Sequence, residues 1–346
     1  MSEPLLSEKF QTRPATWNDV SDIVALLNAS SQSTRGTNFT AVHWQKRHWY
    51  ESGINLETDS LLILVGKTAV AYAELTSEAP YVVYEMVGAV HPDYRQQGLG
   101  SQFVKWAENR VQKTLDKAPE GTAVFIQNSI FDSNQPGRDL LATHGFKIVR
   151  DFVYLQIHID KKPPDPVWVD GIEERPLQST DWAKVGPALG SAFEDHWGIV
   201  DFDEEEEVET DDTNVNPRES DPEAFNSAYF NSPGLCFVAW DGDEVVGSCL
   251  CNATTVEFPK AGYLGSLSIR RPWRRRGIGL ALTLRALNTF YKRGITHVLT
   301  DTDGDSFTKA FRVYQKAGME IFRRELVYEK TIRLGHDLVK RNMPSA

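Results

Sequence analysis

Short runs of apolar residues, some of them alternating with polar ones, divide the chain into predicted strands. Gly66-Lys67 in the first half and Asp241-Gly242-Asp243 in the second lie between two such runs and are typical of hairpin turns. The predicted strands cover residues 61–65, 69–76, 82–90 and 123–127 in the first half, and 235–240, 245–252, 262–269 and 297–301 in the second.

Apolar residues spaced three or four apart predict the helices. In each half a long amphipathic helix follows the third of these strands and ends near Lys113 or Arg293. Antiparallel strands followed by a strand–helix–strand alternation predict an α/β (α+β) domain with a mixed sheet in each half. The shorter predicted helices cover residues 17–30, 41–52, 182–193 and 222–230, and one more precedes each final β segment.

The two halves share landmarks in the same order. Arg13-Pro14 is matched 162 residues later by Arg175-Pro176, and His144-Gly145-Phe146 is matched 173 residues later by Ala317-Gly318-Met319. Between the halves lies a segment rich in proline, which is typical of a stiff linker. The sequence therefore predicts two tandem copies of one domain, at residues 1–160 and 172–332, with a linker at 161–171 and a tail at 333–346.

Acidic residues are concentrated in one segment. The formal net charge of the 346 residues is −11, and residues 201–221 alone contribute −10, with 11 acids and a single Arg. This segment lies where the second half gains residues over the first, so we interpret it as an insertion. Two interpretations are open, a solvated disordered loop or a segment that attracts a cationic acceptor. The acidic balance argues against a nucleic-acid partner.

The cysteine content and the lack of long apolar runs indicate where in the cell the protein is located. Three cysteines are too few for a disulfide framework, and Cys249 and Cys251 lack the ligand set of a metal site, so we predict buried thiols and no metal. The first residues lack the apolar run of a signal peptide, and no stretch approaches the roughly 18 apolar residues of a membrane helix. We therefore expect a cytoplasmic protein without a membrane partner; no pattern indicates its oligomeric state.

A glycine turn joins a strand to the long helix in each half. Glycines permit a sharp turn and close approach of a ligand, and the helix start offers free N–H groups and the positive end of the helix dipole. The turn therefore predicts a cradle for a pyrophosphate, with a purely structural turn as the alternative. It matches neither the Walker A loop nor the dinucleotide fingerprint. The copies read Arg95-Gln96-Gln97-Gly98-Leu99-Gly100 and Arg274-Arg275-Arg276-Gly277-Ile278-Gly279.

With these turns, and with a later Ala-x-x-x-Tyr-x-x-x-Gly helix, both halves resemble the GCN5-related N-acetyltransferase (GNAT) superfamily, in a tandem arrangement similar to that of the mycothiol synthases. The resemblance implies acetyl-CoA as cosubstrate, with its pyrophosphate on the glycine turn and its pantetheine arm in a splayed gap between two strands. The cofactor-binding residues that it implies are Leu267, Ser268, Ile269, Arg274, Arg275, Arg276, Gly277, Ile278, Gly279 and Leu280 in the second half, and Arg95, Gln96, Gln97, Gly98, Gly100 and Asn134 in the first.

The late helix differs between the halves at the residue that matters for chemistry. Family members carry a tyrosine there, whose hydroxyl protonates the leaving thiolate. Tyr314 occupies this position in the second half, whereas the first half has Leu141, which cannot donate a proton. The resemblance therefore implies a catalytic second domain and a degenerate first domain; the alternative for Tyr314 is a core aromatic packed beside Phe311. The usual Asn of this helix is Asn134 in the first half and Phe307 in the second.

Transfer of an acyl group to an amine also needs a proton acceptor. The predicted central strands of the second half carry no carboxylate, so the candidates are Glu257 in a hairpin and His196 at the end of a helix. Glu85 occupies the corresponding strand of the first half. A helix C-terminus is the alternative role for His196, and proton transfer through ordered water remains a further route.

Our hypothesis is an N-acetyltransferase that moves an acetyl group from acetyl-CoA directly to a primary amine of a small-molecule acceptor. Two alternatives stay open. One is a non-catalytic acyl-CoA-binding or regulatory protein, and the other is an acetyltransferase for Lys-rich peptides. No residue selects the acceptor, because specificity in such folds lies in variable loops.

Overall fold

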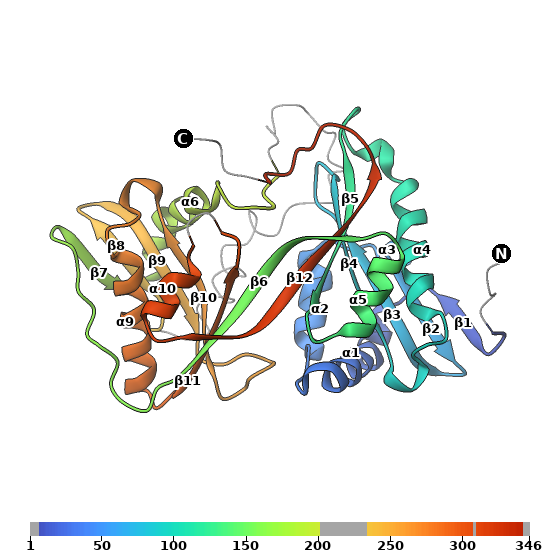
Figure 1. The fold of residues 1–346 in the computed structure, drawn as a ribbon, viewed down its shortest axis with the longest axis horizontal. Coiled ribbons are helices and arrows are strands. Elements are labelled where there is room, and N and C mark those ends of the chain that lie inside the picture. The colour runs from blue at the N-terminus through green and yellow to red at the C-terminus, as the bar shows by residue number, and fades with distance from the viewer. Residues whose placement is uncertain (1–6, 201–233, 307–308, 342–346) are drawn as a thin grey trace. The chain divides into compact units, whose positions relative to one another are not determined.

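The computed structural model describes residues 7–200, 234–306 and 309–341 (Figure 1). The acidic segment 201–221, the predicted helix 222–230 and Phe307 lie outside the described residues. Among the residues described, no helix has both the length and the apolar character needed to cross a membrane. These residues also contain no group of three potential metal ligands.

The first half begins with an antiparallel meander and continues with a strand–helix–strand unit, as the hydrophobic pattern predicts. Its strands are β1 (Phe10–Arg13), β2 (Ser60–Val65), β3 (Thr68–Thr76), β4 (Val83–Val90), β5 (Val124–Phe131) and β6 (Lys147–His158). Its α-helices are α1 (Val20–Arg35), α2 (Val42–Glu51), α3 (Leu56–Asp59), α4 (Leu99–Gln112) and α5 (Gln135–Thr143). Short 3-10 turns cover Trp17–Asp19, Pro92–Tyr94 and Leu115–Lys117.

The second half repeats this order. Its strands are β7 (Ile172–Pro176), β8 (Phe237–Asp241), β9 (Glu244–Asn252), β10 (Gly262–Ile269), β11 (His297–Asp303) and β12 (Glu320–Arg333). Its helices are α6 (Trp182–Phe193), α9 (Ile278–Lys292) and α10 (Phe311–Lys316), with 3-10 turns at Ser179–Asp181 and Arg271–Trp273. The mixed-sheet α/β prediction is confirmed in both halves.

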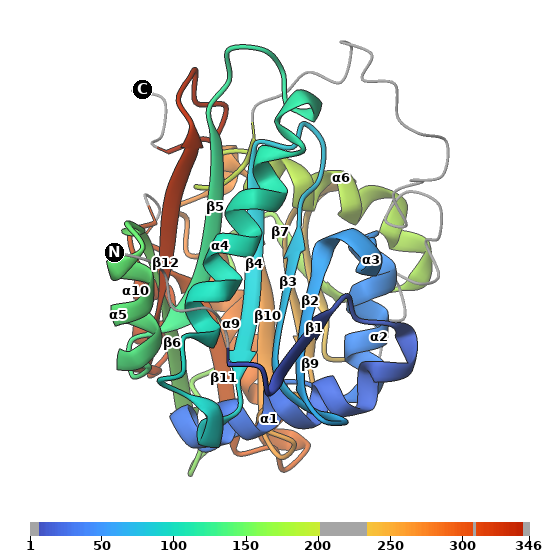
Figure 2. The same cartoon turned by 90° about the vertical axis from the view of Figure 1, so that its right-hand side faces the viewer.

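Each half contributes five consecutive strands to the sheet of one compact unit. The order is β1-β2-β3-β4-β5 in the first unit (Figure 2) and β11-β10-β9-β8-β7 in the second. All neighbours are antiparallel except β4 with β5 and β10 with β11, which are parallel. In the second unit α9 and α10 cover one face of the sheet and α6 covers the other. The residues of β8 and β9 are therefore almost all buried, and read as continuous apolar runs.

The last strand of each half is exchanged. Among the described residues, the first unit comprises 7–149 and 326–338, and the second comprises 150–200, 234–306, 309–325 and 339–341. Thus β6, the last strand of the first half, pairs with β11 of the second half from Phe152 to His158. The end of β12 belongs to the first unit in return. The predicted pattern placed a final β segment in each half but did not indicate this exchange.

Arg333 fixes the end of β12 within the first unit. Its guanidinium donates to the carbonyl oxygens of Leu115, Pro119 and Thr122 at 2.9, 2.7 and 2.7 Å. Further along β12, the Glu329 carboxylate accepts a hydrogen bond of 2.8 Å from Gln127 of β5. The exchanged strand is thus held by specific polar contacts as well as by its place in the sheet.

The exchange predicts that neither half folds alone. Residues 1–160 and 161–346, produced separately, each lack a strand of their sheet and expose an unpaired edge, so we expect aggregation or incomplete folding. Produced together, they should co-purify with the circular dichroism spectrum of the intact chain. As a control, the intact chain cut at a protease site placed in the 161–171 linker should stay folded. Cooperative unfolding of isolated 1–160 at the stability of the whole chain would contradict the prediction.

Candidate active site

The parallel strands β10 and β11 pair over only three residues. Their pairing runs from Gly262 with Val298 to Leu264 with Thr300, and the Thr300 hydroxyl donates to the Leu264 carbonyl oxygen at 2.8 Å. Beyond this point β10 continues to Ile269, paired only with β9 among the described strands. Because backbone groups alternate between the two edges of a strand, part of those in Leu267–Ile269 face the gap. We call the point where the strands part the fork.

The first unit has a corresponding fork, where β4 and β5 pair only from Val83 to Glu85, and a β-bulge at Gly265 distinguishes the second fork from it. The register of β10 against β9 shifts between Leu264 and Ser266, whereas β4 pairs with β3 without a shift from Glu85 to Val90. A bulge adds one residue on one strand, so the side chains before it change faces relative to those after it. When the two halves are aligned at the glycine turn, residues of β10 before Gly265 are therefore shifted by one position relative to β4.

The glycine turn starts the long helix with a backbone that suits an anion. Gly277 caps α9 at a φ of 90°, and Arg275 also lies in the left-handed region at 62°. The first unit repeats this geometry at Gly98 and Gln96, with φ of 81° and 60°. Residues with such alternating conformations direct successive N–H groups into one concavity, next to the positive end of the helix dipole. Both turns thus have the backbone of a pyrophosphate cradle.

Arg274 has a different role from the one expected. Its guanidinium donates to Asp195 at 2.9 Å, to the Ala192 carbonyl oxygen at 2.9 Å and to the Ile269 carbonyl oxygen at 3.0 Å. Arg271 donates to the same carboxylate at 3.0 Å. The Arg274 side chain therefore joins the turn to the end of α6, whereas the sequence led us to expect a phosphate contact.

The two arginines that follow remain available. Arg275 and Arg276 are exposed, and among the described residues neither has a hydrogen-bond or ion-pair partner. Ile278 is buried and offers only its backbone, whereas Leu280 is partly buried in the core. A Cβ built on Gly279 would stay 3.7 Å or more from its neighbours, so the start of α9 is not tightly covered.

The turn of the first unit is more closed and less basic. Arg95 donates to the Ser33 hydroxyl at 2.7 Å, and Gln97 accepts from Lys9 at 2.7 Å. A Cβ on Gly100 would approach Leu140 to 2.6 Å, so α5 lies directly against the start of α4. His144 also bonds to Ser101 at 2.9 Å across these two helices.

Asn134, expected to contact the cofactor, is the N-cap of α5. Its side chain accepts a hydrogen bond of 3.2 Å from the backbone N–H of Gly137. Asparagine is among the residues that N-caps favour, because its oxygen satisfies a backbone donor that the helix leaves free. The side chain therefore has a local structural role in this helix.

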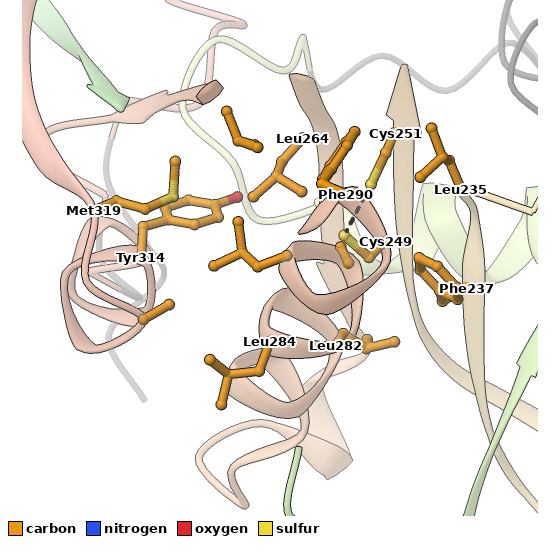
Figure 3. Close-up of a cluster of buried hydrophobic side chains, with 14 of the residues drawn as sticks. Leu235, Phe237, Cys249, Cys251, Leu264, Leu282, Leu284, Phe290, Tyr314 and Met319 are labelled. Atoms are coloured by element: carbon orange, nitrogen blue, oxygen red, sulfur yellow. Dashed lines mark hydrogen bonds between the residues drawn. The ribbon is translucent and has the colours of Figure 1, made fainter. Parts of the chain in front are cut away.

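Tyr314 lies in the core directly beside the second fork. It is 4% exposed, and its hydroxyl points toward Leu264 (Figure 3). Burial raises its pKa, with Cys249 adding to the shift and Thr300 opposing it. Leu264 and Thr300 are the last paired residues of the fork. Tyr314 is thus a core aromatic whose hydroxyl lies beside the fork, and its role as proton donor stays a prediction.

A carboxylate that the sequence analysis missed lies on the other face of the sheet. The hydroxyl of Tyr263 on β10 donates to Asp301 on β11. Burial raises the pKa of Asp301 to about 6, and the nearby Glu325 adds to the shift. Asp301 ends one of the predicted strands, but alternation alone did not show that it would meet Tyr263 beside the fork. To predict this contact, one would have to know of the bulge at Gly265, which turns Tyr263 to this face.

The two candidate bases from the sequence have other surroundings. Glu257 forms a two-point ion pair with Arg323, at 2.5 and 3.0 Å, so its carboxylate is already neutralised. His196 follows α6 and packs edge-on against Phe193, with ring centroids 4.5 Å apart. Burial lowers its pKa. Neither residue lies on β10 or β11, the two strands of the fork.

A strand pair that parts beside the start of a helix suits an extended ligand with a pyrophosphate at one end. Acyl-CoA is a ligand of this kind, since an extended pantetheine arm follows its pyrophosphate. The sequence profile described as "Acetyltransferase (GNAT) family" matches residues 23–146 and 201–319. The chain therefore belongs to the GNAT acetyltransferase family, whose members use acyl-CoA cosubstrates, and it is an acetyltransferase.

Individual relatives agree with this assignment over most of the chain. A mycothiol acetyltransferase of Streptomyces scabiei is 23% identical over 333 residues, which cover 94% of this chain and 97% of that protein. A GCN5-related N-acetyltransferase structure from Sphaerobacter thermophilus superposes with a TM-score of 0.75 at 29% identity, covering 98% of this chain and 100% of the other. A tandem GNAT protein from the clavulanic acid biosynthesis pathway shares the fold, with a TM-score of 0.66 at 13% identity, covering 94% and 99%.

The ion pair at Asp195 generates a prediction about stability. Burial raises the pKa of this carboxyl, but the hydrogen bonds of Arg274 and Arg271 more than offset that effect and hold the pKa at about 2. A carboxyl whose pKa falls on folding stabilises the folded state above its unfolded value near 4. The contribution, about 2 kcal/mol, is lost as the pH falls toward 2.

We therefore expect Asp195→Asn to lower the free energy of unfolding by about 2 kcal/mol at pH 7. The difference from wild type should shrink to about half by pH 3. Urea unfolding of both proteins between pH 3 and pH 7 measures this. Asp160→Asn, an exposed substitution in the same unit, is the control. A penalty for Asp195→Asn that stays constant over this range would contradict the ion-pair interpretation.

Proposed function

We propose that the second unit binds acetyl-CoA and transfers its acetyl group directly to the primary amine of a small-molecule acceptor. The observation that carries the proposal is the position of Tyr314, whose buried hydroxyl points toward the last paired residue of the fork (Figure 3). In an acyl transfer the departing thiolate develops negative charge, and a placed O–H donor stabilises it. Burial keeps the phenol protonated until that moment.

The residues around the fork supply binding. The backbone N–H groups of the turn at Gly277, with the exposed guanidinium groups of Arg275 and Arg276, would hold the pyrophosphate. The edge of Leu267–Ile269 that faces the gap would pair with the amide groups of the pantetheine arm. Acetyl-CoA supplies an activated acyl group, and this protein supplies orientation and proton transfer.

We propose that the first unit is a degenerate copy with a scaffolding role, and that the boundaries 1–160 and 172–332 mark the two copies. Leu141, buried at the tyrosine position, has no proton to donate. Leu140 covers Gly100, and Arg95 is bound to serines of α1. These contacts leave the first turn without an exposed arginine and with little room beside its helix.

Replacement of the tyrosine tests the catalytic assignment. Tyr314→Phe should lower kcat for CoA release by about 100-fold, because it removes the proton donor while keeping the ring. The KM for acetyl-CoA should change less than twofold. The assay is thiol release with acetyl-CoA and a panel of primary amines, including glucosamine, an alkylamine and a lysine peptide.

Tyr84→Phe is the matched control, because this buried tyrosine of the first unit donates to Thr114 at 2.9 Å. It should leave kcat unchanged. A Tyr314→Phe variant with wild-type kcat rules out the acid role. Acetyl-CoA binding by the wild-type protein without turnover of any amine would overturn the proposed function in favour of a binding protein.

The turn arginines give a second test. The double variant Arg275→Ala/Arg276→Ala should raise the KM for acetyl-CoA about 30-fold, since charged hydrogen bonds to phosphate are each worth more than 1 kcal/mol. The kcat should be retained. Lys292→Ala, an exposed cation at the other end of α9, should leave the KM unchanged. Equal KM values in the double variant and the wild type would assign the phosphates to another surface.

A further inference from the structure

Tyr263 is the residue of β10 next to the fork on the face opposite Tyr314. Leu264, its neighbour, points into the core with Tyr314, so Tyr263 points the other way. Its register partner on β11 is Leu299, one step before the last pair of the fork. In the first unit the last pair joins Glu85 and Gln127. On the antiparallel side, however, Tyr263 pairs with Asn252 at the end of β9, as Glu85 pairs with Thr76 at the end of β3, because of the bulge at Gly265.

The Asp301 carboxylate accepts a hydrogen bond from the Tyr263 hydroxyl. Charged or titratable groups from three strands face this carboxylate. Tyr263 lies on β10, and Tyr154, which is the register partner of Asp301, lies on β6. From β12 come Glu325, which accepts a hydrogen bond of 2.8 Å from Tyr154, and Arg323. Arg323 is already paired with Glu257, so this face carries more negative than positive charge.

We infer that Asp301, acting through the Tyr263 hydroxyl, accepts the proton of the acceptor amine, and that this acidic face selects acceptors that arrive as primary ammonium ions. The inference rests on the proposed function and names the missing half of its proton transfer. The two tyrosines then lie on opposite faces of the same fork, Tyr314 beside the leaving group and Tyr263 beside the incoming amine.

The balance of the reaction assigns every proton. The ammonium first loses one proton to the Tyr263 oxygen as that hydroxyl passes its own proton to the Asp301 carboxylate. The free amine then forms a bond from nitrogen to the acyl carbon, and the carbon–sulfur bond breaks. The sulfur takes a proton from Tyr314, and the second amine proton, lost as the neutral amide forms, restores the Tyr314 hydroxyl. Asp301 releases the first amine proton to solvent before the next turnover.

A base of this kind sets the acidic limb of the pH profile. Burial and Glu325 raise the pKa of Asp301 to about 6, so that kcat/KM should fall as the pH drops below this value. Glu325→Gln removes one of the charges that raise the pKa. The limb should then move to lower pH, while the rate at its plateau stays within about threefold.

The experiment measures kcat/KM from pH 5 to pH 9 with two acceptors of different basicity, glucosamine and a simple alkylamine, for the whole chain. In the wild type the acidic limb should lie at the same pH for both acceptors. Asp301→Asn should abolish this limb and lower the plateau at least 100-fold, and Tyr263→Phe should lower the plateau about 10-fold. Asp160→Asn is the control for a distant carboxylate.

The outcomes separate the two claims. A wild-type protein that acetylates no amine overturns the proposed function. A wild-type protein that does so, with an acidic limb that follows the basicity of the acceptor or that survives in Asp301→Asn, overturns only the inference. Should Asp301→Asn prove misfolded by circular dichroism, Glu325→Gln decides, because an unmoved limb in that variant contradicts Asp301 as the base.

Discussion

Two parallel strands that share only three residue pairs determine the rest of the second unit. Backbone groups that lose a neighbouring strand need other partners, and the gap beyond Leu264 and Thr300 exposes such groups along Leu267–Ile269. The bulge at Gly265 lies next to this point and fixes which side chains reach each face. The position of Tyr314 on one face and of Tyr263 on the other follows from where the strands part.

The glycine turn has the same backbone conformation in both units but carries different side chains. In both units an arginine before the glycines ties the turn to the first helix, through Ser33 in one case and Asp195 in the other. This tie is part of the scaffold. The differences lie in the two residues that follow, which are Gln96 and Gln97 in the first unit and two exposed arginines in the second.

The sequence predicts features that depend on local physics and misses those set by the sheet as a whole. Helix α6 was placed to the residue, and the glycine turns were recognised, because periodicity and glycine act within a few positions. The charge of Arg274 suits a phosphate as well as a carboxylate, and only the fold brings Asp195 to it. Asp301 was passed over because its meeting with Tyr263 depends on a bulge and on a neighbouring strand.

The exchanged strands carry a consequence for synthesis on the ribosome. The partner of β5 at the edge of the first sheet is β12, whose end reaches the first unit only after almost the whole second half has been translated. Until then the nascent first unit has an open edge, which is the kind of surface that recruits chaperones or mispairs with a neighbouring chain. The first unit is therefore translated first but completed last, when β12 has been made.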